Sequence, residues 1–307
     1  MIEVIRVVGL DTGSGFTKCF DGKNKIILRS IYAYRPPTIW EDKTGVIEGV
    51  GEQALQVTQY PNAVKLYPII DGKPQHEAFI KLAKEALSRL KIGFLDKLCL
   101  VSGLPYEIGK QDREQIKQLL KQNLELDEIA VYPQALGTLF DLDLQSATVI
   151  NIGHGTTEIL LIEKLNVLGG ISESLASDYI LSAVSDYIQS KHGFKASVES
   201  VVDLMIGRVD EVTTFGKNVR RGDIESLVKK NVDYLTDKIC YDVRYMLTQL
   251  PTNLECANRI VLSGGGSSIK GMKEAITQKL AVAVLVPNDP IFSNVFGFYK
   301  MGKKLYG

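Results

Sequence analysis

One pattern occurs twice in this chain, 140 residues apart, and it constrains the fold more than any other feature. Each copy has a short apolar run, then Asp or Asn, then two glycines at alternate positions, then a threonine within a second apolar run. The copies are VGLDTGSGFTK, which contains Asp11, and VINIGHGTTE, which contains Asn151. In a chain of 307 residues, such a repeat predicts two related halves, each starting with a strand, a glycine-rich turn and a second strand.

The rest of the chain has the pattern of an α/β protein, because apolar runs of strand length alternate with apolar residues at helical spacing. Helices are expected over 76–92, 111–123, 175–188, 223–250 and 270–279, with a short helix opened by Pro133-Gln134, a last helix from about Phe292, and Asp223 as the N-cap of the longest one. Strands are expected over 4–10, 16–20, 25–31, 97–101, 128–132, 148–152, 157–162, 165–168, 259–263 and 282–286. Residues 32–75 are less regular and rich in turn residues.

Composition excludes several classes of protein. Lys and Arg total 36, as do Asp and Glu, so a nucleic-acid binder that works through its overall charge is disfavoured. The four cysteines form no C-x-x-C pair, which argues against zinc and redox motifs and favours reduced thiols in an intracellular protein. The N-terminal run carries charges, unlike a signal peptide, and no apolar stretch approaches a membrane span. A cytoplasmic protein without membrane contact is expected.

The repeated turns suit the binding of phosphate. Glycines at alternate positions let backbone N–H groups approach an anion without obstruction by Cβ atoms. Asp11 can hold Mg²⁺ through its waters and Lys18 can face a phosphate, whereas Asn151 is neutral and suits a metal less well. A third glycine-rich turn, VLSGGGSSIKG, follows a strand and precedes a helix. One such turn alone could be an ordinary hairpin turn, but three together favour a nucleotide.

The three turns, in this order and spacing, resemble those of the actin/Hsp70/sugar-kinase ATPase superfamily. Three further segments, VSGLP, YPQALGT and DPIFSNVFGFYKMG, resemble the plasmid-segregation actins (ParM type) and the archaeal actin-like proteins close to them. The resemblance implies an α/β fold of two related actin-like lobes, duplicated ribonuclease H-like cores with a nucleotide cleft between them. The first lobe would be 1–145 with a small inserted subdomain at about 32–95, completed by a C-terminal helix over 291–307. The second lobe would be 146–290, with a helical subdomain at about 172–252.

The resemblance also implies site residues. The nucleotide-binding set is Asp11, Gly13, Ser14, Gly15 and Lys18 on the β- and γ-phosphates, Asn151, Gly153, Gly155, Thr156 and Thr157 on the facing side, Gly264, Gly265 and Gly266 around the adenosine, and Asp237 at the ribose. The catalytic residues would be Gln134, which orients the attacking water, and Asp11, which also holds the metal through water. The family has Asp where this chain has Asn151, so slow hydrolysis is expected. His154, between the glycines of the second turn, is interpreted as an ordinary turn residue.

By this resemblance the cofactors are ATP and Mg²⁺, although glycine turns do not settle ATP against GTP. The predicted function is a filament protein that assembles head to tail with ATP and hydrolyses it, in a cytoskeletal role or in plasmid segregation through an adaptor protein that links it to DNA. Two alternatives stay open. A small-metabolite kinase would need a catalytic base, and no clear candidate is present. A membrane-linked adaptor is favoured by Asn151, but the C-terminal YKMGKKLYG lacks the length of an amphipathic anchor.

Overall fold

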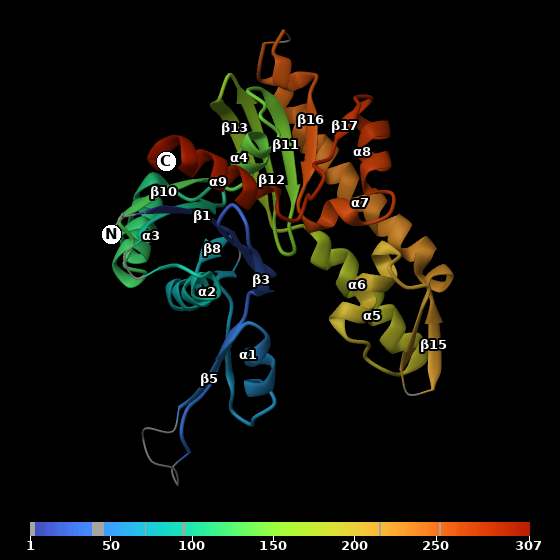
Figure 1. Ribbon diagram of the computed structural model, residues 1–307. Helices are drawn as coiled ribbons and strands as arrows, with labels where there is room; N and C mark the ends of the chain where they lie inside the picture. Colours follow the sequence, from blue (N-terminus) through green and yellow to red (C-terminus); the bar gives the residue numbers. More distant parts are fainter. Residues whose placement is uncertain (1–3, 39–45, 71, 94–95, 215, 252) are drawn as a thin grey trace. The chain divides into compact units, whose positions relative to one another are not determined.

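The two copies of the repeated pattern form equivalent parts of two five-stranded mixed sheets. The structure, a computed structural model, describes residues 4–38, 46–70, 72–93, 96–214, 216–251 and 253–307 (Figure 1). The chain divides into unit 1, residues 1–144 with 292–307, and unit 2, residues 145–291. The sheet of unit 1 has the order β3-β2-β1-β9-β10, and that of unit 2 has the order β13-β12-β11-β16-β17. In each, three consecutive antiparallel strands are extended by two parallel ones, so the predicted duplication is confirmed.

The strands of both sheets lie close to their predicted positions. In unit 1 they are β1 (Ile5–Thr12), β2 (Phe16–Phe20), β3 (Lys25–Arg29), β9 (Lys97–Leu104) and β10 (Glu128–Pro133). In unit 2 they are β11 (Ala147–Ile152), β12 (Thr157–Glu163), β13 (Asn166–Glu173), β16 (Ile260–Ser263) and β17 (Val284–Leu285). The prediction that Pro133-Gln134 opens a short helix is wrong, since Pro133 is the last residue of β10. The short helix, α4 (Leu136–Asp141), begins three residues after Pro133.

Helices cover both faces of the sheet in unit 1. They are α2 (His76–Ser88), α3 (Lys110–Asn123) and α9 (Ser293–Tyr306), together with α4. Leu10 and Leu100 of the sheet are fully buried in one cluster with Phe79 and Leu82 of α2. On the other face α9 lies so close to β1 that a Cβ atom at Gly9 would be 2.2 Å from the carbonyl oxygen of Val295. Glycine therefore sets the depth at which α9 packs.

Residues 32–74 contain more regular structure than their sequence indicates. They form β4 (Tyr32–Arg35), β5 (Ile47–Val50), α1 (Glu52–Val57), β6 (Val64–Leu66), β7 (Ile69–Ile70) and β8 (Lys73–Pro74). The strands are only two to four residues long, which is too short for an alternating pattern to stand out. Residues 39–45, 71 and 94–95, which also belong to the predicted subdomain at 32–95, lie outside the described residues.

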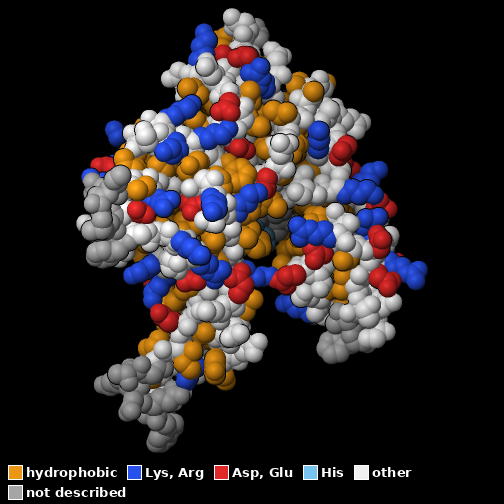
Figure 2. Space-filling model, in the orientation of Figure 1, with side chains coloured by type: hydrophobic (Ala, Val, Ile, Leu, Met, Phe, Trp, Pro, Cys, Tyr) orange, Lys and Arg blue, Asp and Glu red, His pale blue; other side chains and the backbone are white. Residues whose placement is uncertain are grey.

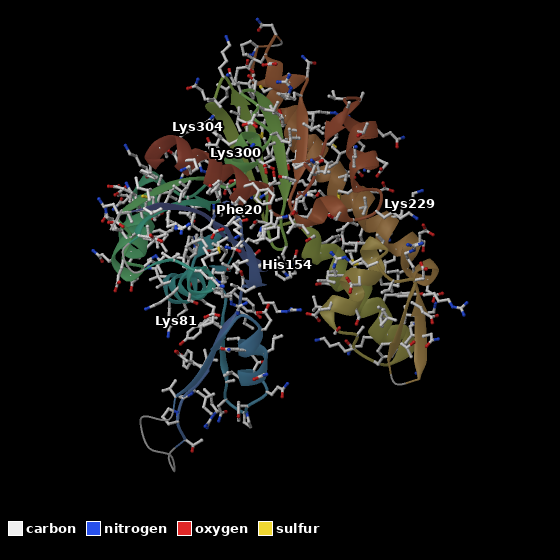
Figure 3. The ribbon with its side chains drawn as sticks, in the orientation of Figure 1. Phe20, Lys81, His154, Lys229, Lys300 and Lys304 are labelled. Carbon is white, nitrogen blue, oxygen red and sulfur yellow. The ribbon has the colours of Figure 1, made fainter. Side chains whose placement is uncertain are left out.

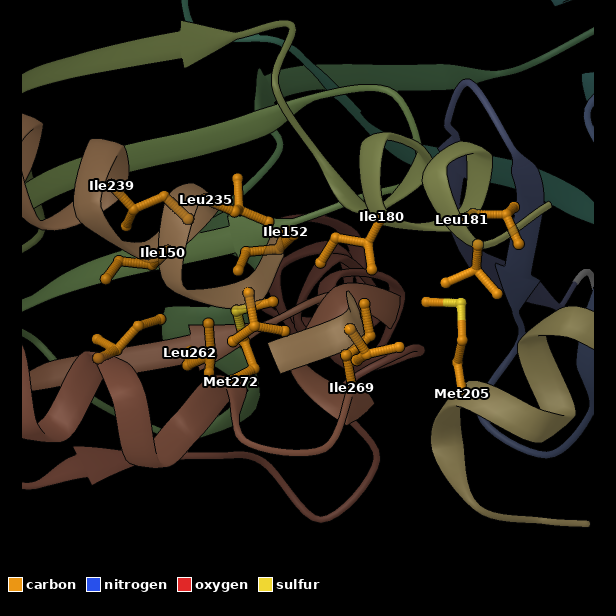
Figure 4. Close-up of a cluster of buried hydrophobic side chains, with 14 of the residues drawn as sticks. Ile150, Ile152, Ile180, Leu181, Met205, Leu235, Ile239, Leu262, Ile269 and Met272 are labelled. Atoms are coloured by element: carbon orange, nitrogen blue, oxygen red, sulfur yellow. The ribbon is translucent and has the colours of Figure 1, made fainter. Parts of the chain in front are cut away.

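Unit 2 has a larger core between its sheet and its helices. The helices are α5 (Ser177–His192), α6 (Val198–Ile206), α7 (Arg221–Thr248) and α8 (Met272–Leu280), with short 3₁₀ turns at Glu255–Ala257 and Gly265–Ser268. A hairpin of β14 (Glu211–Thr214) and β15 (Lys217–Arg220) precedes α7. Figure 4 shows Ile150 and Ile152 of β11 in the same cluster as Leu235 of α7 and Met272 of α8. All four side chains are fully buried, so this cluster joins both helices to the sheet.

The longest helix begins two residues before its predicted N-cap. Arg220 is the N-cap of α7, and Asp223 lies at the third helical position, where its carboxylate accepts the backbone N–H of Arg220 at 2.9 Å. The prediction of Asp223 as N-cap is therefore wrong. Its carboxylate instead accepts a backbone N–H at the start of the helix, as the Glu or Gln at the third position of a capping box does.

The surface and the cysteines agree with the composition. On the face drawn in Figure 2, Lys and Arg side chains are interspersed with Asp and Glu on both units. All four cysteines are free and buried, and burial raises the pKa of Cys19 to about 12 and those of Cys240 and Cys256 to about 11. Among the helices that the structure describes, none has the length and apolar character needed to cross a membrane.

Candidate functional site

The first glycine-rich turn joins β1 to β2 and is closed by its own backbone. Asp11 pairs with Lys18 across the two strands, Thr12 pairs with Thr17, and the N–H of Gly13 donates to the carbonyl oxygen of Phe16 at 3.2 Å. Ser14 and Gly15 form the rest of this turn. The carbonyl oxygen of Gly15 accepts the N–H of Ser30, which fixes the turn to the segment after β3. This turn therefore places the predicted phosphate-binding residues Asp11, Gly13, Ser14, Gly15 and Lys18 together at one end of the sheet of unit 1.

Three predicted site residues of unit 1 form one hydrogen-bonded group. The carboxylate of Asp11 is 1% exposed, and its Oδ2 accepts the Nζ of Lys18 at 2.7 Å. Its other oxygen, Oδ1, accepts the amide Nε2 of Gln134. Gln134 follows β10, and its backbone N–H donates to the carbonyl oxygen of Leu104 at 3.0 Å. Lys18 of β2 and Gln134, from the segment after β10, thus meet at Asp11 of β1, whose buried carboxylate accepts hydrogen bonds from the ammonium group of one and the amide of the other.

A glycine that the sequence analysis did not single out permits this meeting. A Cβ atom at Gly103 would lie 2.5 Å from the ring of Phe298 and 3.0 Å from the Cα of Gln134. Gly103 is part of the VSGLP segment at the end of β9, which lies between β1 and β10 in the sheet. The missing side chain of Gly103 lets α9 and Gln134 approach β9. In the sequence, Gly103 was noted only as part of the VSGLP segment and not as a residue with a role of its own.

The second turn repeats the geometry of the first in unit 2. Asn151 pairs with Glu158 across β11 and β12, Ile152 pairs with Thr157, and the N–H of Gly153 donates to the carbonyl oxygen of Thr156 at 2.8 Å. Gly155 lies between them in the turn. Figure 3 shows His154 at the end of this hairpin. The two turns therefore have the same strand register, with Asp11 and Asn151 at equivalent positions.

The start of α5 anchors the second turn. Ser177 donates its hydroxyl to the carbonyl oxygen of Gly153 at 2.7 Å. The backbone N–H of Asp178 donates to the carbonyl oxygen of His154 at 2.9 Å. Thr157 donates its hydroxyl to the carbonyl oxygen of Leu175 at 2.7 Å. Ser177 was not predicted to act here, because a serine at a helix start gives no signal beyond helix capping.

The third turn packs against the end of β11. β16 runs parallel to β11 with Asn151 opposite Ser263, whose hydroxyl donates to the Asn151 Oδ1 at 3.3 Å. Gly264 has φ of 82°, and a Cβ atom there would be 2.3 Å from the carbonyl oxygen of Ile152. Gly266 is equally restricted by the Ile152 side chain, whereas no atom lies within 4 Å of a Cβ at Gly265. Two of the three glycines are thus required by the fold, and Gly265 is not.

Asp237 is the one predicted site residue of unit 2 that the structure does not bring to these turns. Its side chain is 72% exposed and pairs with Lys279 at 2.8 Å, at the C-terminal end of α8. The Gly264–Gly266 turn precedes the other end of that helix, where Lys270 pairs with Glu225 of α7 at 2.7 Å. Twelve residues of helix, about 18 Å, separate Glu225 from Asp237 along α7. Position on a long helix could not be judged from the sequence alone.

A cavity of about 260 Å³ lies between α6, α7 and α8. Its apolar wall includes Leu204, Ile224 and Val228. Its charged lining is balanced, with Arg221, Lys229 and Lys270 against Glu225, Asp233 and Glu274. The cavity therefore has no excess of positive charge that would select a phosphate.

The described residues fit a metal held through phosphate and water. No group of three or more His, Cys, Asp or Glu that could hold an ion occurs among them. Mg²⁺ is usually bound by one or two carboxylates together with phosphate oxygens and waters. Asp11 supplies one carboxylate beside the first turn, which fits that mode of binding.

A family model described as MreB/Mbl protein matches residues 6–306. The chain belongs to the MreB/Mbl family. The match confirms the actin-like superfamily, and it names a different group within it from the plasmid-segregation actins. One relative is the actin-like protein MamK of Paramagnetospirillum magneticum (strain AMB-1), which is 24% identical over 97% of this chain and 92% of MamK. Another is the cell shape-determining protein Mbl of Bacillus subtilis (strain 168), which is 22% identical over 93% of this chain and 92% of Mbl.

Solved structures show the same fold. MreB5 of Spiroplasma citri bound to AMPPNP aligns with a TM-score of 0.79 over 99% of this chain and 98% of that one, at 18% identity. The MamK double helical filament aligns with a TM-score of 0.79 over 97% and 98%, at 20% identity. At these identities the likeness shows the actin-like fold with its two sheet-containing lobes, which confirms the predicted fold class.

Proposed function

We propose that this MreB/Mbl family member binds ATP with Mg²⁺ and assembles into head-to-tail cytoskeletal filaments. The observation that carries the proposal is the duplicated turn. Both copies keep the same strand register, and the first has a buried carboxylate, a lysine and a glutamine hydrogen-bonded together. A related MreB5 structure is bound to AMPPNP and a MamK structure is a filament, which supports both parts of the proposal.

Each group of residues has a defined task in this proposal. Backbone N–H groups of the two turns bind phosphate oxygens, with Gly13, Ser14 and Gly15 in one turn and Gly153, Gly155, Thr156 and Thr157 in the other. Lys18 adds positive charge, and the backbone of Gly264, Gly265 and Gly266 lies along the adenosine. Mg²⁺, when bound, neutralises phosphate charge, and Asp11 holds its water shell. Gln134, oriented by Asp11, positions the attacking water by hydrogen bonding.

Assembly follows from differential binding. A nucleotide that binds one conformation better shifts the protein toward that conformation. A heterologous contact that does not close on itself then builds an open filament. Hydrolysis removes the γ-phosphate and with it the contacts that favoured the assembling conformation.

Purified protein mixed with Mg-ATP should show more pelletable mass and light scattering than protein with ADP or without nucleotide. Electron microscopy of the ATP sample should show filaments. A monodisperse monomer at high concentration under all three conditions would contradict the proposal.

Replacing Asn151 with aspartate should speed hydrolysis about tenfold, equivalent to about 1.4 kcal/mol of barrier. Asparagine keeps the acceptor oxygen that Ser263 uses but lacks the charge that would polarise a water or hold the metal shell. Phosphate release under assembling conditions measures the effect. A matched control is Asn294→Asp. Asn294 is a similarly buried asparagine whose side-chain oxygen accepts a hydrogen bond from the hydroxyl of Thr138 at 2.8 Å. Equal rates for wild type and Asn151→Asp would contradict the proposed role.

The segments VSGLP, YPQALGT and DPIFSNVFGFYKMG favour a second candidate, plasmid segregation through an adaptor protein. Mbl of Bacillus subtilis is a cell shape-determining protein, and this likeness favours the cytoskeletal role for this chain. Deletion of the gene separates them, because loss of plasmid without a change in cell shape supports segregation, and the reverse supports a cytoskeletal role.

A further inference from the structure

Four polar residues form a row across the sheet of unit 2, next to the second turn. Glu158 of β12 pairs with Ser172 of β13 on one side and with Asn151 of β11 on the other, and Asn151 pairs in turn with Ser263 of β16. Side chains of directly opposed residues lie on the same face of a sheet, so all four share one face. The isoleucines on either side of Asn151 belong to the apolar cluster on the other face. We call these four residues the polar row.

Glu158 is the charged member of the polar row, and it is 2% exposed. Glutamate is rarely buried to this extent unless its charge has a task or a partner. In the duplicated pattern Glu158 occupies the place of Lys18, since each lies directly opposite the residue that precedes its turn, Asp11 in unit 1 and Asn151 in unit 2. Unit 1 therefore sets a cation opposite an acid, whereas unit 2 sets an acid opposite a neutral amide.

The side chain of Asn151 has its oxygen on the side of β16. Its Oδ1 accepts the hydroxyl of Ser263 at 3.3 Å, and a Cβ atom at Gly264 would lie 2.7 Å from that same oxygen. β12 lies on the other side of β11 in the sheet. With the oxygen turned to β16, the rest of the amide offers N–H donors, which suit a carboxylate or a phosphate and not a cation. Asn151 is thus built to orient an acid beside it.

We propose that Glu158 supplies the carboxylate that Asn151 lacks and holds the water shell of Mg²⁺ at the second turn. The proposal rests on the proposed function and adds a positioning residue to it. Mg²⁺ is usually bound through one or two carboxylates together with phosphate oxygens and waters. Glu158 gives the second copy of the repeat an acid, as Asp11 gives one to the first. Opposed side chains in a strand pair start about 5 Å apart, so the Asn151 amide can reach Glu158 and fix its direction.

A carboxylate beside a triphosphate has opposite effects with and without the metal. Without Mg²⁺ it repels the phosphates, and with Mg²⁺ it attracts the cation that they carry. Glu158→Gln should therefore bind ATP at least threefold more tightly than wild type in EDTA, and at least tenfold more weakly with Mg²⁺. A residue that only supports the fold would weaken binding under both conditions when it is replaced.

Titration calorimetry of the full chain with ATP, in EDTA and in Mg²⁺, measures both affinities below the concentration at which the protein assembles. Glu163→Gln is the matched control, because Glu163 lies on the same strand and accepts the backbone N–H of Cys256 at 3.0 Å. It should change neither affinity. Weaker binding of Glu158→Gln under both conditions would overturn this proposal and leave the proposed function intact. A wild type that binds ATP under neither condition would overturn both.

Two further variants separate the charge of Glu158 from its place in the fold. Adding Asn151→Asp to Glu158→Gln returns a carboxylate to the same face, so ATP affinity with Mg²⁺ should recover to within about threefold of wild type. A combined variant that binds as weakly as Glu158→Gln would overturn the proposal. Glu158→Asp keeps the charge and serves if Glu158→Gln does not fold. It should bind ATP more tightly with Mg²⁺ than in EDTA, and equal affinities in the two conditions would overturn the proposal.

Discussion

Replacing Gly297 with valine should prevent unit 1 from folding stably. Gly297 of α9 lies against Gly137 of α4, and a Cβ atom there would be 1.7 Å from the carbonyl oxygen of Gly137 and 2.5 Å from its carbon. Both are backbone atoms, so no side-chain rotation relieves the overlap, and α9 must move off the sheet. A loss of more than about 4 kcal/mol is expected, a large part of the 5–15 kcal/mol that typically separates folded from unfolded states.

Urea denaturation followed by circular dichroism measures this loss. Gly222→Ala is the matched control, because Gly222 is also helical and no atom lies within 4 Å of a Cβ there. Alanine in a helix is favoured over glycine by up to about 1 kcal/mol, so the control should be unchanged or more stable. An unchanged denaturation midpoint for Gly297→Val would show that α4 and α9 do not pack as described.

Replacing Gly265 with valine should reduce ATP affinity at least 100-fold while the fold remains. No atom of the protein lies within 4 Å of a Cβ at Gly265, so the added side chain meets nothing in the free protein. In the proposed function the backbone of this turn lies along the adenosine, and a branched side chain would occupy that space. A 100-fold loss corresponds to about 2.7 kcal/mol of binding free energy.

Titration calorimetry with ATP and thermal denaturation together check this prediction. The neighbouring Gly264→Val is the control for folding, because its positive φ and its contact with Ile152 should lower the melting temperature. Gly265→Val should melt within a few degrees of wild type. ATP affinity equal to that of wild type would exclude this turn from the nucleotide site.

Local patterns predicted the two turns well and the positions along α7 poorly. The Asp-x-Gly-x-Gly and Asn-x-Gly-x-Gly patterns contain the residues that close each hairpin, so turn and strand register follow from nearby sequence. Asp237 depends on how α7 and α8 pack, and the sequence offers no sign that Lys279 holds it at the far end of α8. Asp223 was misplaced because an acidic residue suits both the N-cap and the third helical position.

A place for Gln134 near the first turn was indicated only by the resemblance. Nothing in its neighbourhood in the sequence shows that its amide reaches Asp11, which is 123 residues away. The sheet brings them together because β9 lies between β1 and β10, and strand order depends on contacts between distant segments. The same reasoning explains why Gly103 and Ser263, which lie on strands next to β1 and β11, were missed.

The chain leaves unit 1 after residue 144 and returns to it at residue 292. Helix α9 packs on β1, which precedes it by the whole of unit 2 in the chain. A ribosome therefore releases every residue of unit 2 before it releases the helix that completes unit 1. Unit 2 can reach its final structure during translation, whereas the sheet of unit 1 must wait for α9 with the face around Gly9 uncovered. That interval is when a chaperone would have an apolar surface to bind.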